Sequence, residues 1–179
     1  MSEQQSPNYE DLFYQSEDGL TLYARDYPAP SPDAQCVLLM HGLSRNSRDF
    51  EVLADHLSTR YRVLVAEQRG RGKSEWDTDP TRYAIPHYVR DMFALLQAAN
   101  VSRVATVGTS MGGLMAMVMN SAIPGVFSHV VLNDIGPELC DEGLNRIKGY
   151  VGQGEPVNTW TEAVAYNRRI NEVAFPTLS

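Results

Sequence analysis

A glycine-flanked serine at the end of an apolar strand constrains the fold of this chain more than any other feature. Residues 104–107 are short, β-branched and apolar, and they run directly into the Gly-x-Ser-x-Gly pattern of residues 108–112. Residues 114–119 continue as an apolar, helix-compatible stretch, which Pro124 and Gly125 end. This order of strand, turn and helix is typical of a nucleophile elbow, in which a strained backbone lifts the serine hydroxyl above the sheet edge.

Strand and helix patterns alternate through most of the chain. An opening hairpin is predicted around the Ser-Glu-Asp-Gly turn that starts at Ser16. Its two strands cover residues 9–15 and 20–27, further strands are predicted at 37–40, 63–66, 104–107 and 130–132, and helices at 48–61 and 85–99. Because parallel strands need crossover connections, the fold class is predicted to be α/β, with a mostly parallel sheet and helices on both faces.

The pattern changes after Asp134. Residues 138–150 and 159–173 have the periodicity of two amphipathic helices, separated by glycines and a proline. No strand pattern follows these helices in the sequence. The sheet is therefore expected to be incomplete within these 179 residues.

Charge and hydropathy exclude several classes of partner. The net charge of -7 argues against nucleic acid and against anionic membranes, since both need clustered positive charge. The longest apolar stretch, residues 114–119, is far shorter than the roughly 20 residues of a membrane span. The polar start of the chain lacks the basic and apolar regions of a secretory signal, so cytoplasmic residence is expected.

No cofactor or metal is predicted. The run from Gly70 to Ser74 looks like a phosphate loop, but that motif requires glycine where Glu67 stands. We expect Arg69 and Lys73 in this loop to be solvated or paired with nearby acids, and the alternative is that the loop contacts an anionic substrate. No carboxylate pair or His/Cys cluster has the spacing of metal ligands.

Four motifs at strand ends together resemble the α/β-hydrolase superfamily. They are His41-Gly42, Arg69-Gly70-Arg71-Gly72-Lys73-Ser74, Gly108 to Gly112, and Leu132-Asn133-Asp134-Ile135-Gly136-Pro137. The resemblance covers essentially the whole chain. It implies that residues 1–136 form the N-terminal part of the hydrolase core and that residues 137–179 begin a helical cap. It also implies that the His41 strand lies beside the Ser110 strand, with the Asp134 strand on the other side.

The same resemblance assigns roles to particular residues. Ser110 is implied as the nucleophile, with the backbone N–H groups of Leu43 and Met111 as the oxyanion hole. Asp134 is a candidate triad acid, and the alternative is that its carboxylate orders the loop that follows. His41 is implied to shape the oxyanion loop. The triad histidine is implied to lie beyond Ser179, on one of two further strands, so the C-terminal strands of the fold are expected to be missing.

The other histidines of the sequence are poor candidates for the catalytic base. His129 opens the strand that leads to Asp134, so it is expected at the opposite edge of the sheet from Ser110. His56 lies on a predicted helix and is expected to be solvated, and His87 stands at a helix start where capping or surface exposure is expected.

The sequence is compatible with two functions from different classes. The first is a serine hydrolase that acts on an ester, thioester, lactone or activated C–C bond of a small molecule, with these 179 residues alone inactive. The second is a non-catalytic fragment or pseudoenzyme that binds a small ligand or a partner, including a second chain or fragment that completes the sheet.

Overall fold

The computed structural model describes residues 8–136, 138, 140–154 and 156–172 of the chain. These residues fall into two compact units that divide between Gly136 and Pro137. The first unit holds the sheet, and the second holds a pair of helices. The polar start at residues 1–7, Pro137 of the fourth motif and the predicted helix end at residue 173 lie outside the described residues.

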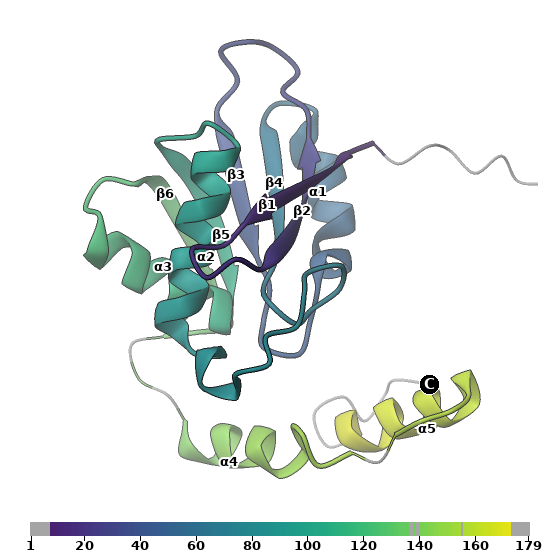
Figure 1. Cartoon of the computed structure of the whole chain (residues 1–179). Coiled ribbons are helices and arrows are strands. Elements are labelled where there is room, and N and C mark those ends of the chain that lie inside the picture. Colours follow the sequence, from purple (N-terminus) through teal and green to yellow (C-terminus); the bar gives the residue numbers. More distant parts are fainter. Residues whose placement is uncertain (1–7, 137, 139, 155, 173–179) are drawn as a thin grey trace, which may run out of the picture. The chain divides into compact units, whose positions relative to one another are not determined.

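Six strands form one sheet in the first unit, in the order β1-β2-β4-β3-β5-β6 (Figure 1). The strands are β1 (Glu10–Gln15), β2 (Thr21–Tyr27), β3 (Cys36–Met40), β4 (Arg62–Glu67), β5 (Val104–Thr109) and β6 (Phe127–Asn133). The β1–β2 hairpin joins the rest of the sheet through antiparallel pairing of β2 with β4. The remaining pairs are parallel, which confirms the predicted sheet. β3 lies beside β5 and β6 lies on the other side of β5, as the resemblance implied.

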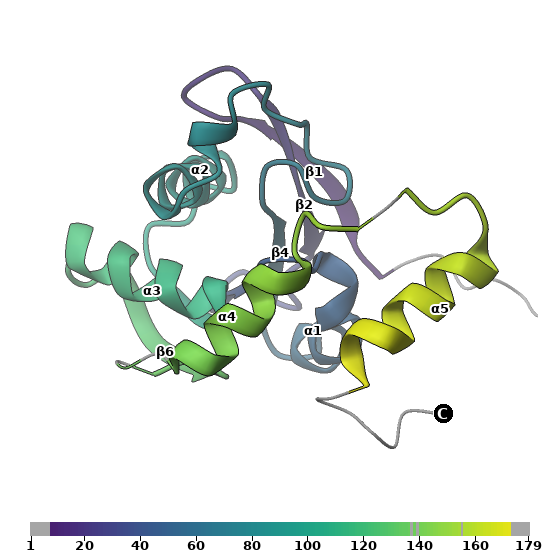
Figure 2. The same ribbon diagram turned by 90° about the horizontal axis from the view of Figure 1, so that it is seen from below.

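Helices cover both faces of this sheet (Figure 2). The short 3₁₀ turn η1 (Ser47–Phe50) and α1 (Glu51–Ser58) lie on one face, while α2 (Ile85–Ala98) and α3 (Met111–Ala122) lie on the other. Successive side chains of a strand point to opposite faces. Val37 and Leu39 of β3 therefore pack with the α1 side, whereas Leu38 and Met40 pack with α2 and α3. A further 3₁₀ turn, η2 (Pro80–Arg82), precedes α2.

The second unit contains α4 (Asp141–Tyr150) and α5 (Trp160–Asn171). The helix predicted from residue 138 begins three residues later. α5 begins with a capping box, in which the Thr159 hydroxyl accepts from the Glu162 N–H and the Glu162 carboxylate accepts from the Thr159 N–H. Trp160, in the first turn of α5, is 89% exposed. Among the described helices of either unit, none has the length and apolar character needed to cross a membrane.

β6 forms one edge of the sheet and is apolar. Val130, Val131 and Leu132 are between 42% and 54% exposed, whereas β3 and β4 are almost fully buried and β5 alternates between buried and half-buried residues. Among the described residues, no strand pairs with the outer side of β6. In the described part of the chain, β6 is therefore an unpaired edge strand, which agrees with the expected incomplete sheet.

A buried arginine holds together the loops at the carboxyl ends of the strands. The Arg69 side chain follows β4 and is only 2% exposed. Its guanidinium donates to Asp18 of the β1–β2 turn, to Asp77 and to Asp91 of α2, with closest distances of 2.8, 2.8 and 2.7 Å. The fork of the guanidinium engages both oxygens of Asp91. Arg69 is thus paired rather than solvated, and it links three elements that are distant in sequence.

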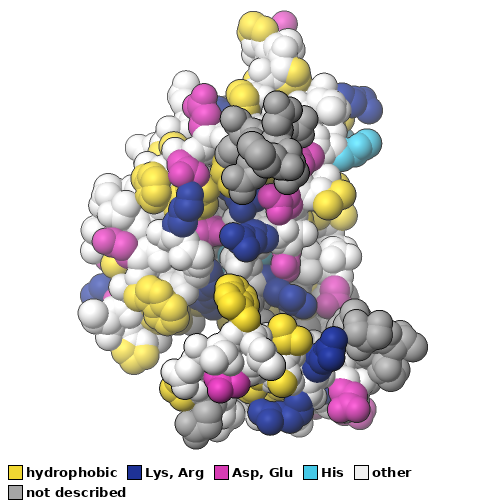
Figure 3. Space-filling view, turned by 90° about the vertical axis from the view of Figure 1, so that its right-hand side faces the viewer, with side chains coloured by type: hydrophobic (Ala, Val, Ile, Leu, Met, Phe, Trp, Pro, Cys, Tyr) yellow, Lys and Arg dark blue, Asp and Glu magenta, His cyan; other side chains and the backbone are white. Residues whose placement is uncertain are grey.

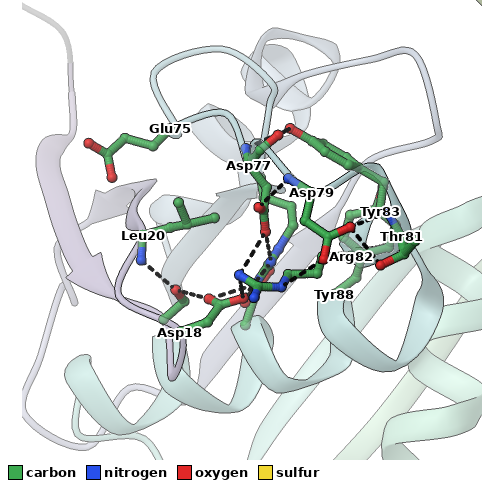
Figure 4. Close-up of polar contacts among 12 residues, drawn as sticks. Asp18, Leu20, Glu75, Asp77, Asp79, Thr81, Arg82, Tyr83 and Tyr88 are labelled. Atoms are coloured by element: carbon green, nitrogen blue, oxygen red, sulfur yellow. Dashed lines mark hydrogen bonds and ion pairs between the residues drawn. The ribbon is translucent and has the colours of Figure 1, made fainter.

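Figure 4 shows how this network continues toward the surface through Arg82, which lies among Asp18, Asp77 and Asp79. The Arg82 pairs are longer, at 3.5 to 3.8 Å, and its side chain is 41% exposed. The Arg69 guanidinium holds the pKa of Asp18 well below its usual range. Ionised Asp18 therefore stabilises the fold above the ordinary pKa of an aspartate, and this contribution decreases as the pH falls below it.

Outside this network, positive and negative side chains are interspersed. Figure 3 shows Lys and Arg side chains standing among Asp and Glu side chains on one face of the molecule. Lys73 pairs with Asp11 at 2.7 Å, and both side chains are about half exposed. Such exposed pairs contribute roughly 0 to 1 kcal/mol each, so Arg69 is the electrostatic element that matters most for the fold.

Replacing Arg69 by methionine is expected to lower the free energy of unfolding by about 3–5 kcal/mol, because Asp77 and Asp91 would be left buried without their cation. Urea denaturation followed by circular dichroism measures the loss. The matched control is Arg82→Gln, which removes a charge from the exposed side of the same network and should cost roughly 1 kcal/mol or less. Equal losses in the two variants would contradict this account.

Candidate active site

Ser110 stands on a sharp turn between β5 and α3. Its backbone has φ of 51° and ψ of -112°, a conformation that non-glycine residues rarely adopt. The Ser110 N–H donates to the carbonyl of Asn133 at the end of β6, at 2.9 Å. The Ser110 carbonyl accepts from the N–H groups of Gly113 and Leu114 in the first turn of α3. These bonds hold the half-buried serine at the carboxyl edge of the sheet.

The glycines on either side of Ser110 are needed for close backbone approach. A Cβ atom on Gly108 would collide with the carbonyl of Gly112, and a Cβ on Gly112 would collide with the carbonyl of Met40 at the end of β3. The start of α3 therefore lies against the backbone of the neighbouring strand. The Gly-x-Ser-x-Gly pattern thus has a steric cause in this fold.

The loop after β3 comes close to the serine. A Cβ atom built on Gly42 would lie 3.7 Å from the Cβ of Ser110. Leu43 follows directly, and Met111 is the first residue of α3, where backbone N–H groups have no partner within the helix. The fold brings together the two segments that were predicted to supply the oxyanion donors, and the roles of Leu43 and Met111 stay predictions.

His41 is fully buried beneath this loop. Its Nδ1 lies 2.7 Å from the Gly42 carbonyl, and its Nε2 accepts from the Gln68 N–H at 3.4 Å. These two contacts fit a neutral ring with its proton on Nδ1. Burial lowers the pKa of His41 to about 4. With both nitrogens engaged, His41 ties the end of β3 to the end of β4, in agreement with its expected structural role.

The structure places no histidine in hydrogen-bond contact with Ser110 among the described residues. His129 pairs with Ala105 near the start of β5, at the end of the sheet opposite to Ser110. His56 is exposed on α1, and His87 lies in the first turn of α2. Within the described residues, the serine therefore lacks a base.

Asp134 lies directly after the strand that binds the Ser110 backbone. It has φ of 54° and is exposed. Its neighbour Asn133 pairs with Thr109 and accepts the Ser110 N–H, so Asp134 stands at the same edge of the sheet as the serine. Its role as an acid stays a prediction.

Sequence reasoning missed Glu67, a buried carboxylate at the end of β4. Its Oε1 accepts from the Ser47 hydroxyl at 2.6 Å, and its Oε2 accepts from the Lys73 N–H at 2.6 Å. Gly72, at φ of 54°, leaves room for this carboxylate, since a Cβ there would overlap it. Glu67 thereby joins the loops after β3 and β4. The glycine was the only local signal, and nothing in the sequence indicated which side chain fills its space.

Arg71 was also assigned no individual role from the sequence. Its Nε donates to the Leu43 carbonyl at 3.1 Å, and its Nη1 donates to the Arg69 carbonyl and the Tyr88 hydroxyl at 2.8 and 2.9 Å. The guanidinium carbon lies 5.2 Å from the centroid of the Tyr88 ring and 5.8 Å from that of Tyr83. Arg71 therefore connects the loop after β3 to the start of α2.

A cavity of about 260 Å³ lies beside the Arg69 network. Its lining residues are Glu17, Asp18, Arg69, Arg82, His87, Arg90 and Asp91. Acidic and basic groups are balanced there, which does not favour a ligand of one sign. In the described part of the chain, no group of three or more His, Cys, Asp or Glu side chains is arranged to hold a metal ion.

Residues 35–156 match the sequence family described as alpha/beta hydrolase fold. A 3-hydroxybutyrate-oligomer hydrolase of Cupriavidus necator is 40% identical over 131 residues, which cover 73% of this chain and 45% of the relative. A 2-(acetamidomethylene)succinate hydrolase of Mesorhizobium japonicum is 30% identical, over 66% of this chain and 42% of the relative. The chain thus spans less than half the length of these two relatives.

Solved structures of hydrolases also match this chain. The crystal structure of an alpha/beta hydrolase from Novosphingobium aromaticivorans matches with a TM-score of 0.90 and 41% identity, over 98% of this chain and 61% of the other. An esterase from Exiguobacterium antarcticum matches with a TM-score of 0.62 and 26% identity, over 69% of this chain and 44% of the other.

Alanine at Gly112 is expected to destabilise the protein by about 1–3 kcal/mol or more, because the added Cβ meets the Met40 carbonyl. Urea denaturation measures the change. Gly149→Ala in α4 is the matched control, since nothing lies within 4 Å of its added Cβ. Alanine normally stabilises a helix interior, so this control should gain roughly 0.5–1 kcal/mol. A stabilising Gly112→Ala would refute the close approach.

The buried His41 is expected to make stability depend on pH. Its pKa falls from 6.5 to about 4 on folding, so the unfolded chain binds a proton between these values while the folded chain does not. The stabilisation is complete above the unfolded pKa, and about 3 kcal/mol is lost as the pH falls from 6.5 to about 4. As the pH falls from 6.5 to about 4, the free energy of unfolding should decrease less steeply in His41→Gln than in the wild type. The exposed His56→Gln control should keep the wild-type slope, and an unchanged slope in His41→Gln would contradict the assignment.

Proposed function

This chain belongs to the alpha/beta-hydrolase family, and we propose that the protein hydrolyses a small molecule through an acyl-enzyme at Ser110. The observation that carries the proposal is the strained turn that presents Ser110 beside the loop after β3. The substrate class is an ester, thioester, lactone or activated C–C bond. The two curated relatives are named as hydrolases of 3-hydroxybutyrate oligomers and of 2-(acetamidomethylene)succinate, which supports a small acyl substrate here.

The proposed reaction starts with attack of the Ser110 Oγ on the substrate carbonyl carbon, while a base takes the hydroxyl proton. The carbonyl oxygen becomes an oxyanion, which the N–H groups of Leu43 and Met111 stabilise by about 2.7–4 kcal/mol each. Collapse of this intermediate breaks the bond to the leaving group, which receives the proton from the base. Water then hydrolyses the acyl-enzyme by the same steps and frees the Ser110 hydroxyl.

We assign the base to a histidine supplied by polypeptide outside this sequence, since none of the described histidines contacts Ser110. Asp134 is our candidate for the triad acid, because it stands at the strand end next to the serine. Loss of the base from a serine hydrolase lowers kcat by about 10⁶, so these 179 residues alone should be almost inactive.

Several further assignments belong to the same proposal. Residues 1–136 would be the N-terminal part of the hydrolase core, and residues 137–179 the beginning of a helical cap. Strands that complete the sheet at β6 would come from the same polypeptide or from a second chain. We expect the protein to act in the cytoplasm on a small molecule without a cofactor.

The lack of a base at Ser110 among the described residues also favours a second candidate function. In this alternative, the chain is a non-catalytic fragment or pseudoenzyme that binds a small ligand or a partner. The exposed apolar edge of β6 would be a surface for such an interaction. Covalent labelling of the serine separates the two candidates.

Replacing Ser110 by alanine in the full-length protein should abolish both ester hydrolysis and labelling by a fluorophosphonate probe. Intact mass spectrometry measures the adduct, and hydrolysis of a para-nitrophenyl ester measures the activity. Ser121→Ala, an exposed hydroxyl on α3, is the matched control and should keep both. Hydrolysis that survives in Ser110→Ala would overturn the proposal, and a wild-type protein without adduct or activity would support the non-catalytic alternative.

A further inference from the structure

Arg71 is a half-buried cation whose hydrogen-bond partners among the described residues are all neutral. Its hydrogen bonds go to the carbonyls of Leu43 and Arg69 and to the hydroxyl of Tyr88. These bonds occupy its Nε and Nη1 atoms. Within the described residues, Nη2 has no recorded partner, and a guanidinium carries its charge at any ordinary pH. One side of the charged group is therefore free to donate.

The other buried or half-buried arginines of the sheet are each paired with a carboxylate. Arg25 pairs with Glu51 at 3.6 Å and Arg62 with Asp26 at 2.6 Å, and Arg69 is surrounded by three aspartates. A partly desolvated charge is usually compensated by an opposite one. In the described part of the chain, Arg71 has no recorded ion pair, so its charge remains available to an anion from outside.

Arg71 stands at the same edge of the sheet as the proposed nucleophile. Arg71 follows β4 and Ser110 follows β5, and β3 lies between these two strands. The loop after β3 contacts both residues, because Leu43 accepts from Arg71 while Gly42 lies against Ser110. Arg71 and Ser110 therefore flank the same short loop, which also holds the proposed oxyanion donor Leu43.

The Arg71 side chain is also held in a fixed orientation. Its guanidinium lies over the rings of Tyr83 and Tyr88, and it donates to the Tyr88 hydroxyl. Little conformational freedom is left to lose when an anion binds, which favours recognition. Arg45 is the other arginine near Gly42, but its charge is paired with Asp49 at 3.6 Å and its side chain is 59% exposed.

We propose that Arg71 binds a carboxylate carried by the substrate, so that the preferred substrates are acyl compounds with a free acid group apart from the bond that is cleaved. This inference rests on the proposed hydrolase function at Ser110. In the bound state, Nη2 donates to the carboxylate oxygens while Nε and Nη1 keep their present partners. Such charge-assisted hydrogen bonds contribute selectivity of about 10- to 100-fold.

The test compares two esters that differ only at the far end of the acyl group, para-nitrophenyl hydrogen glutarate and its neutral methyl ester. The wild-type full-length protein should show a higher kcat/KM for the acid. Arg71→Gln should lower kcat/KM for the acid by about 10- to 100-fold more than kcat/KM for the neutral ester, which loses only the contribution of the Arg71 contact with the Leu43 carbonyl. Arg71→Lys should be intermediate, since it keeps the charge without the planar fork.

Arg60→Gln is the control, because Arg60 is exposed at the other end of the sheet, before β4, and its removal changes the net charge equally. Thermal melting identifies variants that fail to fold. If Arg71→Gln fails to fold, the two esters are compared with Arg71→Lys alone. A wild-type preference for the neutral ester, or equal losses on both esters in Arg71→Gln, would overturn the inference. The second outcome would show that Arg71 only positions the Leu43 loop.

Calorimetric binding of glutarate separates this inference from the proposed function. Glutarate should bind the wild type and Ser110→Ala equally and bind Arg71→Gln at least about 10-fold more weakly. If neither ester is hydrolysed but glutarate still binds through Arg71, the hydrolase proposal is refuted and the carboxylate site stands. If Ser110 hydrolyses the esters and Arg71→Gln binds glutarate like the wild type, the carboxylate site is refuted and the hydrolase proposal stands.

Discussion

The approach of α3 to the end of β3 is the constraint on which the rest of the site depends. Gly112 lies against the Met40 carbonyl, and this contact leaves no room for a side chain. Because the helix starts so close to the sheet, the residue before it must turn through a positive φ, which is the conformation of Ser110. The same closeness places the loop after β3 beside the serine. One steric contact thus sets both the nucleophile's backbone and the position of its neighbours.

The sheet and the elbow could be predicted from the sequence because both leave local signals. Apolar runs mark strands that are buried on both faces, and the spacing around Ser110 marks the turn. Helix bounds were less accurate, since α4 begins at Asp141 after a segment whose periodicity suggested an earlier start. Periodicity reports which face of a helix is apolar but does not report its first hydrogen bond.

The polar contacts of the site could not be predicted, because their partners are distant in sequence. Arg69 meets Asp18 from the first hairpin and Asp91 from α2, and no local pattern connects these three residues. Arg71 stands only two residues from Arg69, yet its hydrogen-bond partners among the described residues are all uncharged. Sequence reasoning treated both as parts of one loop. In the part of the chain that the structure describes, only the fold shows that carboxylates neutralise Arg69 while none stands beside Arg71.

The exposed apolar edge of β6 also has a consequence for how this chain behaves in solution. An edge strand with unpaired N–H and C=O groups and with Val130, Val131 and Leu132 exposed can pair with the same strand of another molecule. The net charge of -7 opposes that encounter through repulsion between like-charged molecules. Added salt shortens the range of this repulsion to about 3 Å at 1 M ionic strength but leaves the apolar attraction in place. The colloidal stability of these residues in isolation should therefore fall as ionic strength rises.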